Sequence, residues 1–260
     1  MAPRPPLTHF LCIPLVTPAS RPQLTASLAT FGADVTSPSG LALPAAAVRP
    51  VGTLHLTLGV MSFPGDEGLD RALALLRSLK PRDLWASARS TGPAAGAGGA
   101  GKAPDTGRPA AGPPAEELRI TLRGLRAMQP ASRASVLYAP PEDRLGALQR
   151  FCEALRAAFQ EAGLMVREER PLLLHATVLN TVYARGGARG GRGGGRGGGG
   201  GGRGGKLTVD VQPVLDRYED EVWAEGLRVE KIAICKMGAQ KTQVDGVEDE
   251  VYQVVGSVNF

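Results

Sequence analysis

Hydrophobic positions recur along the chain with two periods, and each period predicts one kind of element. Four segments place apolar residues at helical spacing, which is typical of amphipathic helices. They cover residues 21–35, 67–79, 143–161 and 213–223. Seven shorter segments are either continuously apolar or alternate with polar residues, which predicts strands. They cover residues 9–16, 53–61, 118–124, 135–138, 172–179, 231–235 and 251–255. This mixture predicts an α+β fold.

The predicted elements come twice in the same order: strand, helix, strand, helix, strand. The two halves share this layout, although their residues outside the central strands do not align. A duplicated α+β fold, in which each half contributes one equivalent strand, is the simplest interpretation.

Two low-complexity segments interrupt this pattern. Residues 90–114 are rich in Gly, Ala and Pro, and residues 185–206 contain 15 glycines among 22 residues. Neither segment has enough apolar surface to order itself. Because loop-closure entropy grows slowly with length, both are interpreted as disordered insertions within a single domain spanning residues 7–260.

Two of the three histidines lie in the same tripeptide pattern. The pattern His-x-Thr occurs at His55–Thr57 and again at His175–Thr177, each time within an apolar, β-branched run. Side chains two positions apart on a strand share a face, so each histidine lies beside its threonine. Two such strands side by side direct two imidazoles and two hydroxyls into one cleft. Imidazoles supply an acid and a base near neutral pH, and hydroxyls bind phosphate oxygens. The pattern therefore indicates metal-free chemistry on a phosphodiester.

Four sequence blocks resemble the two-histidine phosphoesterase superfamily. They are residues 8–15 (THFLCIPL), 54–61 (LHLTLGVM), 174–181 (LHATVLNT) and 232–238 (IAICKMG). The last two blocks are similar to the A-kinase-anchoring-protein-like branch, which also contains a subunit of the activating signal cointegrator complex. This resemblance implies a 2′-5′ RNA ligase-like fold with two lobes and a central groove. It also implies cleavage of 2′,3′-cyclic phosphates or 2′,5′ linkages without a cofactor or metal, with RNA or a small nucleotide as substrate.

The resemblance assigns acid–base catalysis to His55 and His175, and phosphate binding to Thr57 and Thr177. Which histidine is the acid and which the base is left open. A second hypothesis is a nucleotide- or RNA-binding regulatory subunit with little turnover. A third is a subunit of a transcription or repair complex that binds partners on its outer surface.

Five further residues are candidates for substrate contact. Tyr183 follows the second motif and could stack on a base, and Lys236, at the strand end within the last block, could approach a phosphate. The 185–206 tract resembles Arg-Gly-Gly segments that contact RNA through charge and stacking, with Arg185, Arg189 and Arg192 as its candidates. His9 lacks a threonine two positions on, so a structural role is expected for it.

Charge and cysteine content indicate which partners and which cellular compartment the protein has. The net charge is +5, but residues 185–206 carry +6, so the rest of the chain is close to neutral. An electrostatic attraction to nucleic acid would come mainly from that tract. The three cysteines are far apart in sequence and in apolar context, which favours buried free thiols over a disulfide framework or a zinc site. With no signal peptide and no long apolar run, an intracellular protein of the nucleus or cytoplasm, away from the membrane, is expected.

Overall fold

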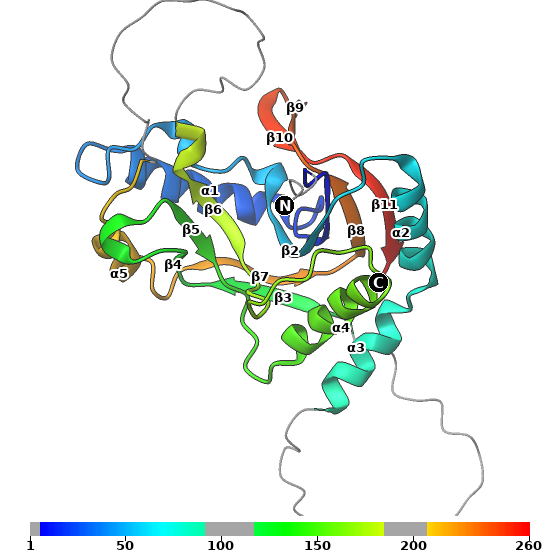
Figure 1. Ribbon diagram of the computed structural model, residues 1–260. Coiled ribbons are helices and arrows are strands. Elements are labelled where there is room, and N and C mark those ends of the chain that lie inside the picture. Colours follow the sequence, from blue (N-terminus) through cyan, green and yellow to red (C-terminus); the bar gives the residue numbers. More distant parts are fainter. Residues whose placement is uncertain (1–5, 92–116, 185–206) are drawn as a thin grey trace, which may run out of the picture.

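The computed structural model describes residues 6–91, 117–184 and 207–260 (Figure 1). The predicted insertion at 185–206 lies outside these residues, as does the one at 90–114 except for its first two residues. The single domain spanning residues 7–260 and its two insertions therefore stay predictions.

Four antiparallel strands form the sheet of the first lobe. Their order is β11 (Val254–Asn259), β8 (Lys231–Lys236), β1 (His9–Pro14) and β2 (His55–Met61). Strands from both ends of the chain therefore meet in this sheet. Two helices pack against its edges, α2 (Asp66–Ser78) on β11 and α4 (Ala147–Glu161) on β2.

The second lobe is built from two smaller sheets. One has the order β4 (Arg126–Ala127), β5 (Val136–Ala139) and β6 (Ala176–Asn180), and the other pairs β3 (Arg119–Arg123) with β7 (Val222–Arg228). A bridge between Leu122 and Pro141 connects the two sheets. Helix α1 (Arg21–Thr36) packs on β7, and the short helix α5 (Gln212–Arg217) precedes that strand.

The two lobes are not the two halves of the chain. Helix α1 from the first half covers a strand of the second lobe, whereas α4 from the second half packs on β2 of the first lobe. The buried core is continuous across this exchange and includes Leu11, Phe31, Phe151 and Trp223. The α+β class is confirmed, and each half contributes one strand of the His-x-Thr pattern: β2 begins at His55, and β6 begins one residue after His175.

A hairpin, β9 (Gln240–Val244) and β10 (Val247–Val251), projects beside the four-stranded sheet. Its two-residue turn is Asp245-Gly246, and both residues have positive φ, 53° and 79°. Asp-Gly tolerates this left-handed backbone, which the right-handed twist of a tight hairpin requires. The single strand predicted at 251–255 is divided between two strands: Val251 ends β10, Val254 begins β11, and Tyr252 and Gln253 lie between them.

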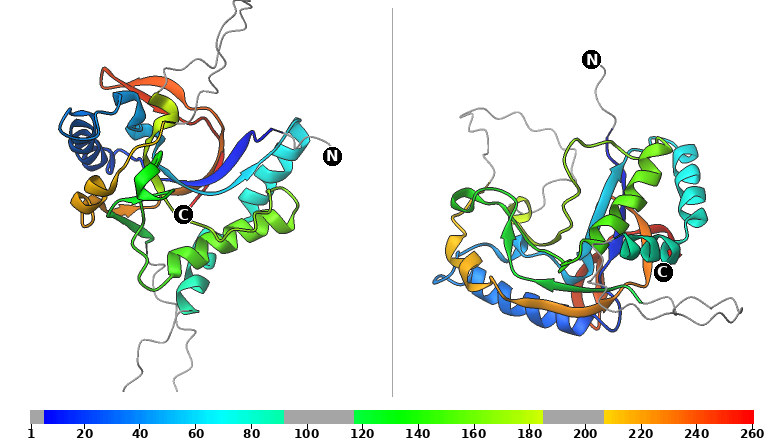
Figure 2. Two further views of the ribbon diagram at one scale, coloured as in Figure 1. Left: turned by 60° about the vertical axis from the view of Figure 1, so that its left-hand side comes forward. Right: turned by 90° about the horizontal axis from the view of Figure 1, so that it is seen from below.

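Three other predictions need correction. The predicted helix 213–223 ends at Arg217, and its remaining residues lead into β7. Helix α3 (Pro81–Ser90) was not predicted; it begins with Pro81 at its first turn and packs beside α4 (Figure 2). The strand predicted at 172–179 starts only at Ala176, because its first residues pair with no strand.

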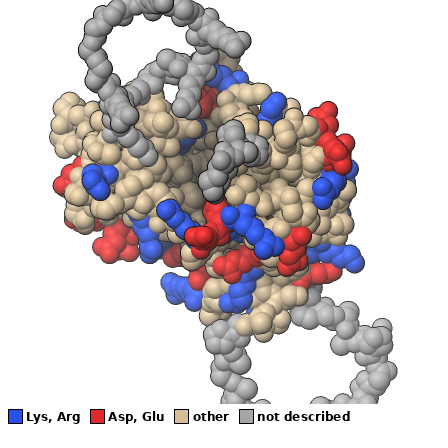
Figure 3. All heavy atoms as spheres, viewed as in Figure 1, with Lys and Arg blue, Asp and Glu red and all other residues tan. Residues whose placement is uncertain are grey.

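The surface carries charges of both signs. On the face in Figure 3, Lys and Arg side chains lie among Asp and Glu side chains. Of the helices within the described ranges, none has the length and apolarity to cross a membrane.

Candidate active site

His55 opens β2, and both of its ring nitrogens have partners. Nδ1 lies 2.7 Å from the carbonyl oxygen of Thr53, and Nε2 lies 2.9 Å from Oγ1 of Thr57. A carbonyl only accepts, so Nδ1 carries the proton. In the neutral ring the Thr57 hydroxyl then donates to Nε2. The pairing predicted from the His-x-Thr spacing thus becomes a direct hydrogen bond.

His175 repeats half of this arrangement in the second lobe. Its Nδ1 lies 2.8 Å from the carbonyl oxygen of Leu173, again two residues upstream. The same argument assigns the proton to Nδ1. The ring contacts Tyr138 edge-on, with centroids 5.5 Å apart. Although His175 lies one residue before β6, its orientation matches that of His55.

Both motifs line one cavity of about 200 Å³. The strands β2 and β6, which carry the motif threonines, contact each other. The lining includes all four predicted residues, His55, Thr57, His175 and Thr177. It also includes Tyr183, which was expected to contact substrate. Four more lining residues were not predicted as site residues: Arg49, Thr53, Asn180 and Tyr252.

Two aromatic rings pack against His55, and one of them belongs to the cavity-lining Tyr252. Phe10 lies 4.9 Å from it and Tyr252 lies 5.2 Å from it, centroid to centroid. Burial lowers the pKa of His55 to about 4, against the opposing effect of the Thr53 hydrogen bond. The neighbouring His175 and Arg49 lower it further. His55 is therefore a neutral imidazole at physiological pH.

The four unpredicted residues reach the cavity through tertiary structure. Arg49 lies before the 3-10 turn η2 (Val51–Thr53), and its backbone N–H donates to Val178 of β6 at 2.9 Å. Tyr252 comes from the break between β10 and β11. No local sequence signal marks either one; only Asn180, which continues the second motif, was within reach of sequence reasoning.

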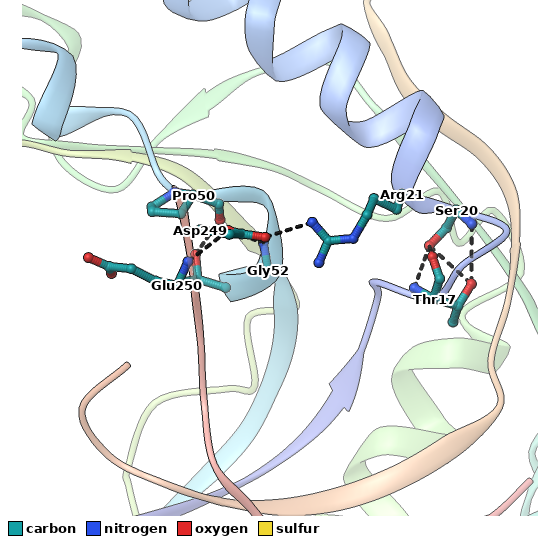
Figure 4. Close-up of polar contacts among 8 residues, drawn as sticks. Thr17, Ser20, Arg21, Pro50, Gly52, Asp249 and Glu250 are labelled. Carbon is teal, nitrogen blue, oxygen red and sulfur yellow. Dashed lines mark hydrogen bonds and ion pairs between the residues drawn. The ribbon is translucent and has the colours of Figure 1, made fainter. Parts of the chain in front are cut away.

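A carboxylate on the hairpin holds η2 in place (Figure 4). Asp249 accepts hydrogen bonds from the backbone N–H of Gly52 at 3.0 Å and from the Arg21 guanidinium at 2.6 Å. Gly52 is required there, because a Cβ would lie 2.5 Å from the carbonyl oxygen of Glu250. The turn fixed in this way ends in Thr53, whose carbonyl orients His55.

Several predicted contacts fall elsewhere. Lys236 pairs with His9, while His55 pairs with Pro14 at the opposite end of β1, so Lys236 lies far from the cavity. Arg185, Arg189 and Arg192 lie outside the described residues. Tyr183 is 42% exposed, and the Arg49 guanidinium covers one side of its ring at 3.8 Å.

The remaining histidine and the cysteines lie outside the cavity. His9 is buried beside Phe63, and its Nδ1 lies 2.9 Å from Oγ1 of Thr8, which is a structural role. The three thiols are free and buried as expected, although β1 and β8 bring Cys12 and Cys235 to 3.7 Å. Across residues 6–91, 117–184 and 207–260 no three His, Cys, Asp or Glu side chains group as metal ligands.

The sequence model of the AKAP7 2′5′ RNA ligase-like domain matches residues 7–260, nearly the whole chain. The chain belongs to this family. The expected membership of the two-histidine phosphoesterase superfamily, in its A-kinase-anchoring-protein-like branch, is thereby confirmed.

One curated protein matches part of this AKAP7-like domain. An uncharacterised protein of Schizosaccharomyces pombe is 26% identical over 125 residues, which are 48% of this chain and 51% of that protein. The match thus spans about half the length of this curated relative.

Solved structures also match over almost their full length. Thermus thermophilus TT0787 has a TM-score of 0.48 with 17% identity, covering 97% of both chains. Escherichia coli LigT complexed with NADP+ has a TM-score of 0.47 with 15% identity, covering 98% of both chains. Usb1 of Kluyveromyces marxianus, solved with uridine monophosphate, has a TM-score of 0.40 with 10% identity, covering 95% of this chain and 98% of that one.

Proposed function

We propose that this protein is a metal-independent phosphoesterase that hydrolyses 2′,3′-cyclic phosphates or 2′,5′ phosphodiesters at RNA ends or in small nucleotides. The observation that supports this is the shared cavity, in which both histidines and both threonines of the motifs meet. Family membership agrees with it. The cavity of about 200 Å³ suits a phosphate and part of a ribose rather than a whole oligonucleotide.

His55 is the general base in this proposal. Nε2 is unprotonated at neutral pH, because the pKa is lowered to about 4 and the ring proton lies on Nδ1, bonded to the Thr53 carbonyl. Its lone pair becomes free for water when the Thr57 hydroxyl turns from Nε2 to the phosphate. Nε2 removes a proton from water as the water oxygen bonds to phosphorus. The proton ends on Nε2 of His55, and the Thr57 oxygen then accepts a hydrogen bond from that Nε2–H.

His175 is the general acid. Its Nδ1–H donates to the Leu173 carbonyl, an arrangement compatible with an imidazolium whose Nε2–H points into the cavity. That Nε2–H protonates the ribose oxygen as its bond to phosphorus breaks. One proton enters the pair at His55 and one leaves at His175, so a proton exchange with solvent restores the starting state.

The threonines bind the nonbridging oxygens. The hydroxyls of Thr57 and Thr177 line the cavity from two different strands, so they can contact one phosphate from opposite sides. Hydrogen bonds that strengthen as charge develops lower the barrier.

The test is hydrolysis of 2′,3′-cyclic-phosphate-ended and 2′,5′-linked oligoribonucleotides in EDTA. His55→Ala and His175→Ala should each lower kcat by roughly 10²–10⁴-fold, because each removes one proton transfer. His9→Gln is the matched control, since it replaces the histidine that lies outside the cavity, and its turnover should equal that of wild type.

Two results would contradict the proposal. Activity lost in EDTA and restored by a divalent cation contradicts the metal-free mechanism. Wild type that binds these ligands without cleaving them favours the regulatory nucleotide-binding subunit instead.

A further inference from the structure

Arg49 is a buried cation with an unused hydrogen-bond donor. Only 6% of the residue is exposed, although it lines the cavity of the two histidines. Its Nη2 has no hydrogen-bond partner among the described residues. The nearest carboxylate oxygen, Oε2 of Glu250, is 3.6 Å away, which is beyond hydrogen-bond length.

Leaving this donor unpaired in a buried place is energetically unfavourable. A buried charge is normally paired and hydrogen-bonded, because desolvation is otherwise uncompensated. Glu250 compensates part of the charge of Arg49 but not the geometry of its N–H groups. An anion in the cavity would accept the remaining N–H hydrogen bond of Arg49 and compensate the rest of its charge.

The guanidinium is held in place before any ligand arrives. Its Cζ lies 3.8 Å from the centroid of the Tyr183 ring, and its backbone N–H is bonded to Val178. The residue before it, Val48, forms a bridge with Leu179. Arg49 is thus attached to β6, the strand that carries Thr177. A donor fixed in this way loses little entropy on binding.

We propose that Arg49 is the anion-binding residue of this site and donates Nη2–H to a nonbridging oxygen of the phosphate held by the two His-Thr pairs. This inference rests on the proposed function and adds a residue of this chain that the His-x-Thr pattern does not contain. Attack by deprotonated water adds negative charge to the nonbridging oxygens. A preorganised cation therefore binds the transition state more strongly than the substrate.

The first arm of the test replaces the side chain. Arg49→Met should lower kcat on 2′,3′-cyclic AMP by about 10²–10³-fold, as expected for removal of one oxyanion donor, with a smaller change in KM. It should also weaken binding of inorganic phosphate at least 10-fold, measured by calorimetry. Arg49→Lys keeps the charge but loses the planar guanidinium that stacks on the Tyr183 ring. Its kcat and its phosphate affinity should therefore lie between those of wild type and Arg49→Met.

Arg156→Met is the matched control. Arg156 is an arginine of α4 with 8% exposure, paired with Glu168 at 3.5 Å and absent from the cavity lining. Its replacement removes a comparably buried cation, so a change in stability is expected while kcat and phosphate affinity stay at wild-type values.

A second arm predicts an effect of opposite sign. Glu250→Gln removes the carboxylate that competes for Arg49, with almost no change in shape. Phosphate should bind more tightly, by several-fold, and the gain should disappear in the double variant with Arg49→Met. If Arg49→Met does not fold, the phosphate affinity of Glu250→Gln alone decides the matter.

The outcomes separate this inference from the proposed function. If wild type turns nothing over but Arg49→Met loses phosphate binding, Arg49 is the anion site of a binding protein and the proposed hydrolysis is wrong. A folded Arg49→Met with wild-type kcat and wild-type phosphate affinity overturns the inference while leaving hydrolysis standing. Unchanged or weaker phosphate binding in Glu250→Gln overturns it as well.

Discussion

The surroundings of the two cavity histidines are asymmetric at the level of single residues. His55 is packed against Phe10 and Tyr252, while His175 has one aromatic neighbour, Tyr138. The local hydrogen bond is nevertheless the same, a carbonyl two residues upstream. Identical motifs therefore provide one hydrogen-bonding pattern, while burial lowers the pKa of His55. In the proposed mechanism this keeps the His55 imidazole neutral, as a base must be.

The pH dependence of turnover follows from His55. Burial lowers its pKa to about 4, so the free enzyme keeps its base unprotonated far below the ordinary histidine value of about 6.5. The acid limb of kcat/KM should therefore fall near pH 4. A pH profile on 2′,3′-cyclic AMP, with enzyme stability checked at each pH, measures this limb.

The matched comparison is Tyr252→Ala. It removes one of the rings that desolvate His55, so the acid limb should move toward higher pH without loss of the imidazole. An acid limb already near pH 6.5 in wild type would show that His55 is not the base.

Sequence reasoning found the two motifs because they are local. A His and a Thr two positions apart share a strand face wherever the strand lies. Arg49 and Tyr252 have no such signature: one precedes η2, the other sits in the break after β10, and both reach the cavity only when distant strands pair. The prediction that Lys236 contacts substrate is not supported, again because strand pairing decides the position. The register places Lys236 beside His9, at the end of β1 opposite to His55.

The β9–β10 hairpin and the residue just after it contact three parts of the cavity wall or its support. Asp249 accepts from Gly52, Glu250 pairs with Arg49, and Tyr252 just beyond packs on His55. Three of the five residues 248–252 thus contact groups that line or orient the cavity. Figure 4 shows the contacts of Asp249. Loss of the hairpin anchor should therefore affect both stability and turnover.

Replacing Asp249 with Ala tests this anchor. The Asp249 side chain is 7% exposed, and its loss leaves the Arg21 guanidinium and the Gly52 N–H without their partner. We expect a loss of about 3 kcal/mol in the free energy of unfolding, measured by urea denaturation. Glu117→Ala, which breaks the exposed pairs with Arg119 and Arg228, should cost less than about 1 kcal/mol.

The same anchor depends on pH in a defined direction. Burial opposes ionisation of Asp249, but the hydrogen bonds from Arg21, Gly52 and Glu250 outweigh it and lower its pKa. The pair therefore contributes fully above the ordinary aspartate pKa of about 4 and is lost as pH falls through the lowered value. The difference in stability between wild type and Asp249→Ala should shrink below pH 4, and a constant difference would exclude the ion pair as its source.

At the scale of the whole molecule, the chain crosses between lobes several times. The periodicity predicted most helices and strands, and their order suggested two equivalent halves. It could not show that β8 returns to β1 and that β11 pairs with β8, because the β8–β1 pairing joins distant parts of the chain and neither pairing is marked by a local pattern. The groove therefore depends on both ends of the chain.

The residues on either side of the 185–206 tract are held to the second lobe, so the tract can be replaced by a linker. Both of its flanking segments are fixed beside β6: the Thr181 hydroxyl donates to the carbonyl of Leu207 at 2.5 Å, and Val209 pairs with Ala134. A short Gly-Ser linker can therefore join residue 184 to residue 207. We expect this variant to keep the wild-type unfolding free energy and to hydrolyse 2′,3′-cyclic AMP within about two-fold of wild type, because the cavity residues are untouched.

Binding of long RNA should respond differently if the arginines of the tract contact phosphates. Removing +6 charges would then weaken binding to a single-stranded RNA and flatten the salt dependence of its affinity, at a slope of about 0.7 per lost phosphate contact. A variant with the five arginines changed to Gln and the glycines retained separates charge from length. Equal salt slopes in wild type and in both variants would show that RNA is held by the folded lobes alone, whereas loss of cyclic-nucleotide turnover in the linker variant would show that the tract belongs to the catalytic unit.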